Sequence, residues 1–312
     1  MSELRDNPFY FYEAPKKPAI RKLGTILCDM VETAPFVFRD RLYRFESVRP
    51  HGMNPANPLE RSFFRVVDAE SGESGAPFGY DHHLGSAFAR GDEVVALGVK
   101  DRWAGDTVTL FRSRDLVRWE ETDVRFPGLR CFNTNLAEKD GATYMLIESE
   151  EGVPFTFRFA KSKDLRSWEL LPEEFIFQKD RYAGGPALYT LPDDPHFYVL
   201  YLEAYPGPCY ANCIARSLDL KEWEYSPLNP VLMYGEEDRR IADPRLSAED
   251  RARVGRALDI NNSDAELCEY KGQTVIYYSW GCQRGIEFLA EARCDMRMKA
   301  FLQGFFGEKP PV

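Results

Sequence analysis

One segment recurs three times along the chain, and it constrains the possible folds more than any other feature. Its pattern is S-x-D-L-x-x-W-E, and the copies begin at Ser113, Ser162 and Ser217. Successive copies therefore start 49 and 55 residues apart. That interval is the length of a unit of four short strands, and such a unit buries its apolar faces only by packing against neighbouring copies.

Degenerate copies at 67–70 and 293–296 continue the repeat upstream and downstream, which makes five units. Alternating apolar residues joined by tight polar turns indicate strand pairs inside the units, for example at 35–45 and 135–147. In the second pair Asp140-Gly141 is a favoured two-residue hairpin turn. Together these patterns predict an all-β fold, a five-bladed β-propeller of four-stranded blades.

A single segment, 247–258, has the character of a helix. It opens with Ser247, has Asp250 three residues later, and continues with good helix formers. We therefore predict one domain over 1–312, with an N-terminal arm or closing strand at 1–27 and a short helical insertion between blades four and five. The helix either lies over one face and shapes the pocket or packs only on the rim.

Composition excludes several classes of function. The chain has 312 residues and a formal charge of -10, with no basic stripe, so we expect no nucleic-acid partner. The N-terminus is charged and no long apolar run follows, which predicts a cytoplasmic protein with no membrane partner. The seven cysteines lack paired zinc-site spacing, and Cys209 and Cys213 would bind a metal only if other ligands converged on them. The oligomeric state is left open.

The repeated signature, followed by 227–232 with the sequence Pro-Leu-Asn-Pro-Val-Leu, resembles the five-bladed propellers of glycoside hydrolase families 43 and 32 and their relatives. The resemblance covers the chain from about Cys28 onward. The signature itself has a structural interpretation. Its Ser and Asp can bond turn backbone, while its Leu and Trp fill space between blades. It therefore predicts fold strongly and chemistry only by association.

In a propeller the first strand of each blade lines the channel, so polar residues entering those strands should converge at one mouth. Glycoside hydrolysis needs two carboxyl groups, one protonated and one ionised. Glu32, Asp81, Asp264 and Glu266 are the predicted catalytic carboxylates. Asp264 and Glu266 are two residues apart and would share a strand face, so that one pKa would rise. Our first hypothesis pairs Glu32 with one of these two.

The resemblance supports this set only in part. Family 43 members usually present an Asp before a Pro in blade one, an Asp in blade three and a Glu before Gly-Pro in blade four. Here Glu32 stands before Pro35, similar to a variant of some galactan-directed members, and blade three has Asn133 and Asn135. The position of the usual acid is Gly184. Either the acid has moved to blade two or five, or the reaction has been lost.

The predicted sugar-binding residues are amides, histidines and aromatics near the channel entries. Amides offer a donor and an acceptor to sugar hydroxyls, histidine can also supply a proton, and flat rings stack on the C–H face of a sugar. The set is His82, His83, Trp103, Asn133, Asn135, Tyr182, Asn262 and Trp280. Glu148 and Glu203 end second strands, and we expect them outside the site. Arg102, Arg181 and Arg245 are candidates for binding a carboxylate or phosphate.

The leading hypothesis is an exo-acting glycoside hydrolase that acts on the terminal sugar of an oligosaccharide or glycoside by carboxylate acid/base catalysis, with no cofactor. The resemblance would allow a divalent ion in the channel, but no ligand set in the sequence announces one. A glycoside phosphorylase or transglycosidase is the close alternative and would need those arginines. A non-catalytic carbohydrate-binding propeller is the alternative from a different class.

Overall fold

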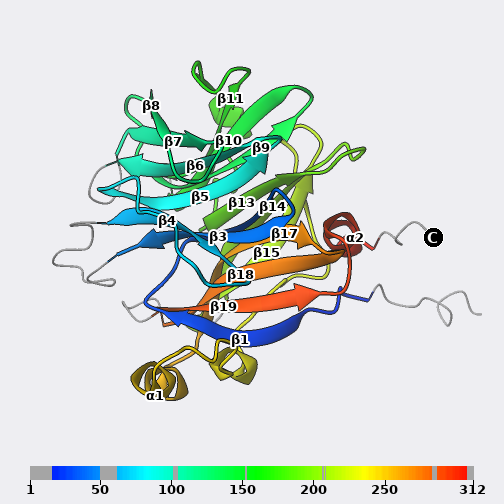
Figure 1. The fold of residues 1–312 in the computed structure, drawn as a ribbon. Helices are drawn as coiled ribbons and strands as arrows, with labels where there is room; N and C mark the ends of the chain where they lie inside the picture. Colours follow the sequence, from blue (N-terminus) through cyan, green and yellow to red (C-terminus); the bar gives the residue numbers. More distant parts are fainter. Residues whose placement is uncertain are drawn as a thin grey trace, which may run out of the picture.

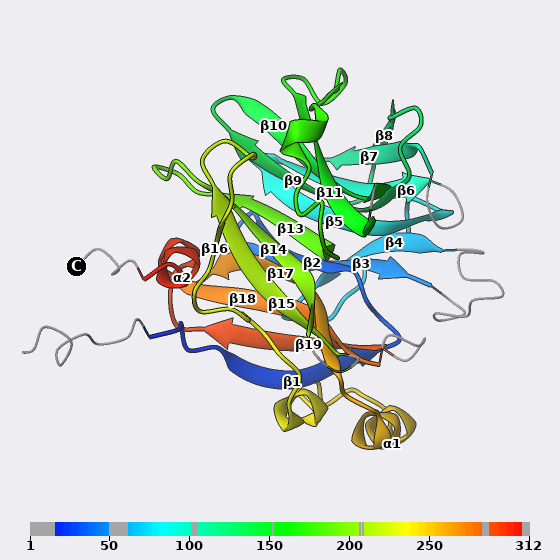
Figure 2. The same cartoon turned by 180° about the vertical axis from the view of Figure 1, so that it is seen from behind.

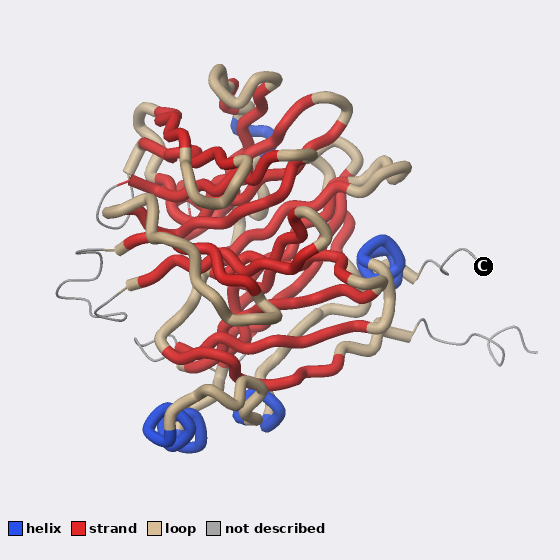
Figure 3. Tube along the Cα trace, viewed as in Figure 1, coloured by secondary structure: helices blue, strands red, loops and turns tan. Residues whose placement is uncertain are grey.

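Strands make up just over half of the residues that the computed structural model describes, and the helices among these residues are short (Figure 3). The structure describes residues 16–49, 62–100, 105–151, 153–205, 207, 209–282 and 287–307. Within these residues no helix has the length and apolarity needed to cross a membrane.

Three separate antiparallel sheets follow one another along the first half of the chain (Figure 1, and from behind in Figure 2). The first contains β2 (Thr33–Phe38), β3 (Arg41–Val48) and β4 (Phe63–Asp68). The second contains β5 (His82–Arg90), β6 (Glu93–Lys100), β7 (Thr107–Ser113) and β8 (Glu120–Arg125). The third contains β9 (Cys131–Lys139), β10 (Ala142–Glu151), β11 (Val153–Ser162) and β12 (Glu169–Leu170).

The second half of the chain forms one eight-stranded sheet made of two antiparallel groups. One group contains β13 (Gly184–Thr190), β14 (Phe197–Tyr205), β15 (Cys209–Ser217) and β16 (Glu224–Tyr225). The other contains β17 (Asn261–Tyr270), β18 (Gln273–Gly281), β19 (Glu287–Cys294) and, paired with β19, the early strand β1 (Arg21–Cys28). The parallel bridge between Tyr210 and Asn261 joins the two groups.

The first strands of these groups form a closed ring. Among the described residues β2 contacts β5, β5 contacts β9, β9 contacts β13, β13 contacts β17, and β17 returns to β2. Apolar clusters fill the space between successive groups, and the one containing Ile26, Leu42 and Tyr277 joins the last group to the first. Sheets arranged in this way are consistent with a propeller. The number of blades stays a prediction here, because two groups share one sheet.

The repeated signature forms a turn at the end of the third strand of a group. In the third copy the Ser217 hydroxyl accepts from the Leu220 amide at 2.8 Å, and Asp219 accepts from Lys221 and Glu222 at 2.8 and 3.0 Å. Leu220 has a φ of 66°, which these bonds hold in place. The other two copies make the same bonds, so the structural interpretation of the signature is confirmed.

Local turn and helix signals are also present in the structure. Asp140 and Gly141 both have positive φ, 51° and 74°, as a type I′ hairpin turn requires. Helix α1 (Ala248–Arg256) lies inside the predicted insertion, and the Ser247 hydroxyl accepts from the Asp250 amide at 3.0 Å. The helix packs against β1, and none of its residues lines the pocket described below, which favours the rim alternative.

The expectation of a single helical segment was wrong. A second helix, α2 (Met298–Gly304), follows β19, and short 3-10 helices occur at Glu173–Phe175 and Glu236–Arg239. With only seven residues α2 is too short to show a clear period, although it buries Phe301 and Leu302 against the apolar cluster of the last two groups. All seven cysteines are free thiols.

Candidate active site

Four of the five first strands begin with a β-bulge. The register slips by one residue near the start of β5, β9, β13 and β17. In three of them a residue at the bulge is left-handed, with φ near 50°: Leu84, Gly185 and Asp264. A bulge bends its strand and changes the direction of one side chain. Here the bulges turn these residues toward the inside of the ring.

The bulge residues line a pocket of about 210 Å³ at the mouth where the first strands begin. Leu84, Phe132, Asn133, Gly185 and Asp264 come from the four bulged strands. The walls are completed by residues from other segments, chiefly Glu32, Arg49, Glu148, Phe155, Tyr182 and Glu287. The pocket therefore combines carboxyl groups with an arginine, an amide and aromatic rings.

Glu32 immediately precedes β2, and it is buried together with Arg49, the residue that follows β3. A guanidinium nitrogen of Arg49 donates to Oε2 of Glu32 at 2.6 Å. Both side chains are more than nine-tenths buried, so each of the two groups is compensated by the other and not by water. Glu32 is therefore the carboxyl group of the pocket that is paired with an arginine.

Glu148 enters the pocket from β10 and is only 5 % exposed. Its Oε2 accepts from the Asn133 amide nitrogen at 2.8 Å and from the Gly185 backbone amide at 3.3 Å. Burial raises the pKa of Glu148 to about 8, and the neighbouring charges of Asp264 and Glu32 add to the increase. Glu148 is therefore mostly protonated at neutral pH.

Asp264 and Glu266 both face the channel, but at different depths. Burial, followed by the charge of Glu32, raises the pKa of Asp264 to about 7. Glu266 accepts from the Ser86 hydroxyl at 2.8 Å and from Asn135 at 3.1 Å, and burial raises its pKa to about 8. Asp264, Glu266 and Glu32 together line a space of about 10 Å³, which is enough for about one water molecule.

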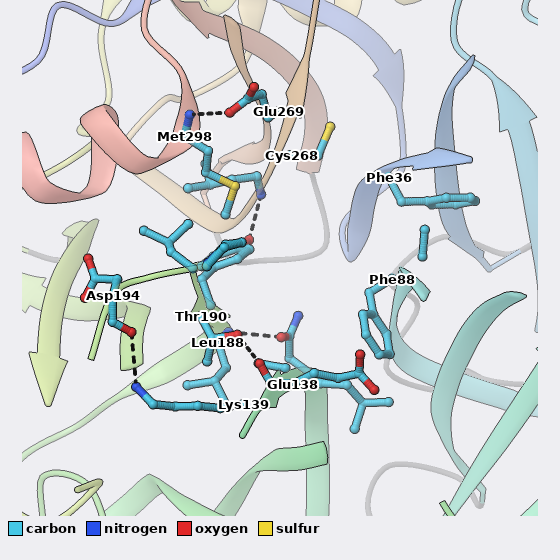
Figure 4. A pocket seen from close by; sticks show the side chains of 18 of the residues that line it. Phe36, Phe88, Glu138, Lys139, Leu188, Thr190, Asp194, Cys268, Glu269 and Met298 are labelled. Carbon is cyan, nitrogen blue, oxygen red and sulfur yellow. Dashed lines mark hydrogen bonds between the residues drawn. The ribbon is translucent and has the colours of Figure 1, made fainter. Parts of the chain in front are cut away.

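A larger cavity of about 1110 Å³ lies at the other mouth, lined by the far ends of the same first strands (Figure 4). Several of its polar groups are already bonded within the protein. Glu138 pairs with Arg90 at 2.5 Å, and Glu269 accepts from the Met298 amide at 3.1 Å. Phe36, Phe88 and Leu188 add apolar surface there. Most of the carboxyl residues that line the large cavity are exposed, whereas three of the four that line the smaller pocket are buried, so we take the smaller pocket as the candidate active site.

The structure brings together only some of the residues that the sequence singled out. Glu32, Asp264, Asn133 and Tyr182 line the candidate pocket. Glu266 and Asn135 line the large cavity at the other mouth and are bonded to each other. Asn135 also accepts from the Leu188 amide at 3.0 Å, so its amide group is fully engaged by protein.

Asp81 and the two neighbouring histidines lie away from the pocket, contrary to expectation. Asp81 is exposed and has a φ of 62°, so it belongs to the turn before β5. His82 is held between the Tyr80 carbonyl at 2.8 Å and the Thr109 hydroxyl at 2.9 Å. His83 is fully buried and does not line the pocket. The structure therefore does not bring these three residues into the candidate pocket.

Asn262 and Trp280 are also displaced from the expected site. Asn262 is buried and bonded to Lys22 at 2.7 Å and to Asp238 at 3.0 Å. Trp280 is fully buried, stacks on Phe288 and donates to the Thr25 hydroxyl, so it has no ring face left for a sugar. Trp103 lies outside the described residues.

Sequence reasoning missed Glu148 and Arg49. Glu148 was expected outside the site, but it lines the pocket, whereas Glu203 pairs with Arg181 at 2.7 Å and does not. The sequence carries a signal for Glu148, because Glu148 stands two residues after the buried Leu146 on β10 and so shares a strand face with it. A carboxyl at a buried position of such a strand needs a special environment. Arg49 follows a strand end and carries no comparable signal.

The described residues contain no group of three or more His, Cys, Asp or Glu side chains placed to hold a metal ion. We therefore assign no step to a metal. The arrangement in the pocket, an ion-paired carboxylate beside buried protonated carboxyls, is suited to moving protons to and from a bound molecule.

Comparison with known proteins relates the fold, but not the sequence, to a group of enzymes. No protein-family model matches the sequence, and no curated protein matches it significantly. A solved structure described only as a glycoside hydrolase superposes with a TM-score of 0.63 at 12 % identity, covering 96 % of each chain. An α-L-arabinofuranosidase from Podospora anserina, solved with cellotriose, gives 0.58 at 8 % identity over 89 % of this chain and 98 % of its own.

The Bombyx mori family 32 β-fructofuranosidase, solved as a mutant with sucrose, gives a TM-score of 0.58 at 14 % identity. The match covers 86 % of this chain and 61 % of that one. The expected resemblance to the glycoside hydrolase propellers is therefore confirmed at the level of fold. Identities this low carry no assignment of reaction or of site residues.

Proposed function

We propose that this protein is a glycoside hydrolase, built as a five-bladed propeller in which the eight-stranded sheet counts as two blades. The observation that carries the proposal is one pocket holding Glu32, ion-paired with Arg49 at 2.6 Å, together with Glu148 and Asp264, two carboxyls whose pKa values burial raises to about 8 and about 7. Hydrolysis of a glycoside requires one ionised and one protonated carboxyl group across the bond that breaks.

In the proposed reaction Glu32 is the ionised partner. It either accepts a proton from the attacking water or attacks the anomeric carbon itself, and Arg49 keeps it charged before substrate arrives. The protonated partner is one of the two buried carboxyls, Asp264 or Glu148. Neutral forms of both are favoured by burial, which is the usual way a protein keeps a carboxylic acid protonated near pH 7.

The size and lining of the pocket favour a single sugar ring. A space of about 210 Å³ is smaller than the pockets that hold drug-sized ligands, so we propose exo-action on a terminal sugar. Tyr182, Phe132 and Phe155 offer rings to the C–H face of a sugar, and Asn133 offers an amide to its hydroxyls. A cytoplasmic location, with imported oligosaccharides as substrate, completes the proposal.

Phosphorolysis receives less support. A phosphate nucleophile would need cationic groups in the pocket. Among the described residues that line it, Arg49 is the only cation, and it is bonded to Glu32. Arg181 pairs with Glu203 and Arg245 with Asp243 at 2.7 Å each, and neither lines the pocket. Arg102 lies outside the described residues.

The experiment is hydrolysis of a panel of aryl glycosides, namely arabinofuranosides, xylosides, galactosides, fucosides and fructosides, with and without phosphate. We expect release from at least one of them, at least about 10³-fold slower in Glu32→Gln. Asp81→Asn is the matched control, since Asp81 is an exposed turn residue, and it should keep wild-type rates.

Three results would count against hydrolysis. Release that requires phosphate would indicate phosphorolysis instead. Equal losses in Glu32→Gln and Asp81→Asn would remove Glu32 from the mechanism. No release from any glycoside, with sugar binding still detected by calorimetry, would identify a carbohydrate-binding propeller.

A further inference from the structure

Gly184 and Gly185 lie at the start of β13, where Gly185 lines the candidate pocket and the side chains of Tyr182 and Glu148 lie close to Gly184. A Cβ built at Gly184 would lie 2.5 Å from the Tyr182 hydroxyl oxygen and 3.3 Å from Oε1 of Glu148. Real Cβ atoms do not approach other atoms as closely as 2.5 Å, so a side chain at position 184 would require the Tyr182 hydroxyl to move. The end of the Glu148 side chain lies beside the same space and would also be in tight contact with such a side chain.

We infer that Glu148, which reaches the candidate pocket from the second strand of its sheet and lies beside Gly184, is the proton donor of this site. The inference rests on the proposed function. That proposal leaves open whether Asp264 or Glu148 donates the proton, and the inference assigns this role to Glu148.

The position of Glu148 relative to Glu32 supports this assignment. Asp264 lies with Glu32, because both line the small space of about 10 Å³ that Glu266 also lines. Glu148 does not line that space. Glu148 and Glu32 both line the candidate pocket of about 210 Å³, together with Tyr182 and Phe155, so the two carboxyl groups share the pocket but not the small space. An acid and a base that act on opposite sides of one glycosidic bond must be separated by the bond and the attacking group.

The hydrogen bonds of Glu148 leave one oxygen for the proton. Both bonds that the described residues donate to this carboxyl, from Asn133 and from the Gly185 amide, go to Oε2. Oε2 is therefore the carbonyl-like oxygen, and Oε1 is left to carry hydrogen and to meet a bound substrate. The titratable and charged groups that share the pocket with it are Tyr182, Asp264, Glu287, Glu32 and Arg49.

The step balances without any further reactant. The bond between the anomeric carbon and the glycosidic oxygen breaks, and its electron pair stays on that oxygen, which takes the proton from Oε1 of Glu148. Water supplies the hydroxyl group that ends on the anomeric carbon, and its remaining proton passes to Glu32. Exchange with solvent then returns a proton to Glu148 and removes one from Glu32, so one water is consumed for each bond cleaved.

The test compares leaving groups, because a proton donor matters only when the leaving oxygen needs a proton. For the sugar found with the panel, the dinitrophenyl glycoside and the methyl glycoside are hydrolysed by wild type, Glu148→Gln, Asp264→Asn and Glu203→Gln. Glu203 is the matched control, since it is a carboxyl near the end of the second strand in the next group and is paired outside the pocket. We expect Glu148→Gln to lose about 10²- to 10⁴-fold on the methyl glycoside and less than about tenfold on the dinitrophenyl glycoside.

On the methyl glycoside the wild-type rate should decline at alkaline pH as the donor loses its proton, and the residual rate of Glu148→Gln should lack that decline. Neither protein should show such a decline on the dinitrophenyl glycoside. Retained turnover of this substrate shows that the variant is folded, and Glu148→Ala replaces it if the Gln variant does not accumulate. Equal losses on both substrates would overturn the inference and make Glu148 structural. Leaving-group selectivity in Asp264→Asn instead would assign the donor to Asp264. Wild-type inactivity on the whole panel would refute the proposed function, and the inference with it.

Discussion

The pH dependence of folding provides a test of Glu148 that needs no substrate. The ordinary pKa of this carboxyl is 4.5, and burial raises it to about 8 in the folded protein. Between these values the folded chain keeps a proton that the unfolded chain has lost. The stability that this group contributes is therefore fully present below pH 4.5 and is lost as the pH rises through about 8.

The magnitude follows from the two pKa values. Each pH unit in this window costs about 1.4 kcal/mol of unfolding free energy for one proton, so the whole window amounts to about 5 kcal/mol. The Gln side chain of Glu148→Gln has no proton to lose. The wild type should therefore lose on the order of 1 kcal/mol per pH unit relative to the variant between pH 5 and pH 8. Asp264 and Glu266 titrate in both proteins and largely cancel in the difference.

The assay is reversible urea unfolding of wild type, Glu148→Gln and Glu203→Gln at pH 5, 6, 7 and 8. The difference between wild type and Glu148→Gln should change steadily with pH, whereas the curve of Glu203→Gln should stay parallel to that of wild type. Parallel curves for all three proteins would mean that Glu148 is ionised in the folded state, and the argument from burial would fail.

Two further substitutions test the pocket wall and the repeated turn. Gly185→Ala should cost about 1 to 3 kcal/mol in urea unfolding and slow turnover, because Gly185 has a φ of 53° and a Cβ there would lie 2.9 Å from Asp264 Oδ1; wild-type stability and rate would show that the wall adjusts freely. Ser217→Ala should cost about 1 kcal/mol without changing turnover, since it removes the acceptor that holds Leu220 at positive φ; a loss of rate at unchanged stability would contradict the structural role of the signature.

The fold was predictable because its signals are local. The Ser and Asp of each signature bond amides two or three residues away, and Asp140-Gly141 adopts the turn that its composition favours. Helix α1 begins at a side-chain cap that is visible in the sequence. The short helix α2 was missed because its burial depends on Phe301 and Leu302 meeting strands distant in the sequence, which no local pattern reports.

The site was predictable only in part, because bulges and long-range burial decide it. Strand alternation puts Asp264 and Glu266 on one face at successive heights, and both do face the channel. Alternation does not report the register slip between Ser263 and Glu266, at which Asp264 has a left-handed backbone and lines the pocket while Glu266 lines the cavity at the other mouth. The place of Trp280 near a strand end predicts a ring that can stack on a sugar, but the ring packs on Phe288. A bulge of one residue is not encoded by periodicity.

Gly184 and Gly185 show why a catalytic role in such a fold is not tied to one position in the sequence. The pocket is assembled from strand beginnings that converge on one space, so a side chain missing from one strand can be replaced by a side chain from the next. At Gly184 the missing side chain leaves room that the Tyr182 hydroxyl and the Glu148 carboxyl share, and the Gly185 amide holds that carboxyl in place. Transferring a role by sequence position would therefore find only glycine and conclude that the acid is lost. The physical question is which carboxyl fills the space, and here the answer lies on the neighbouring sheet.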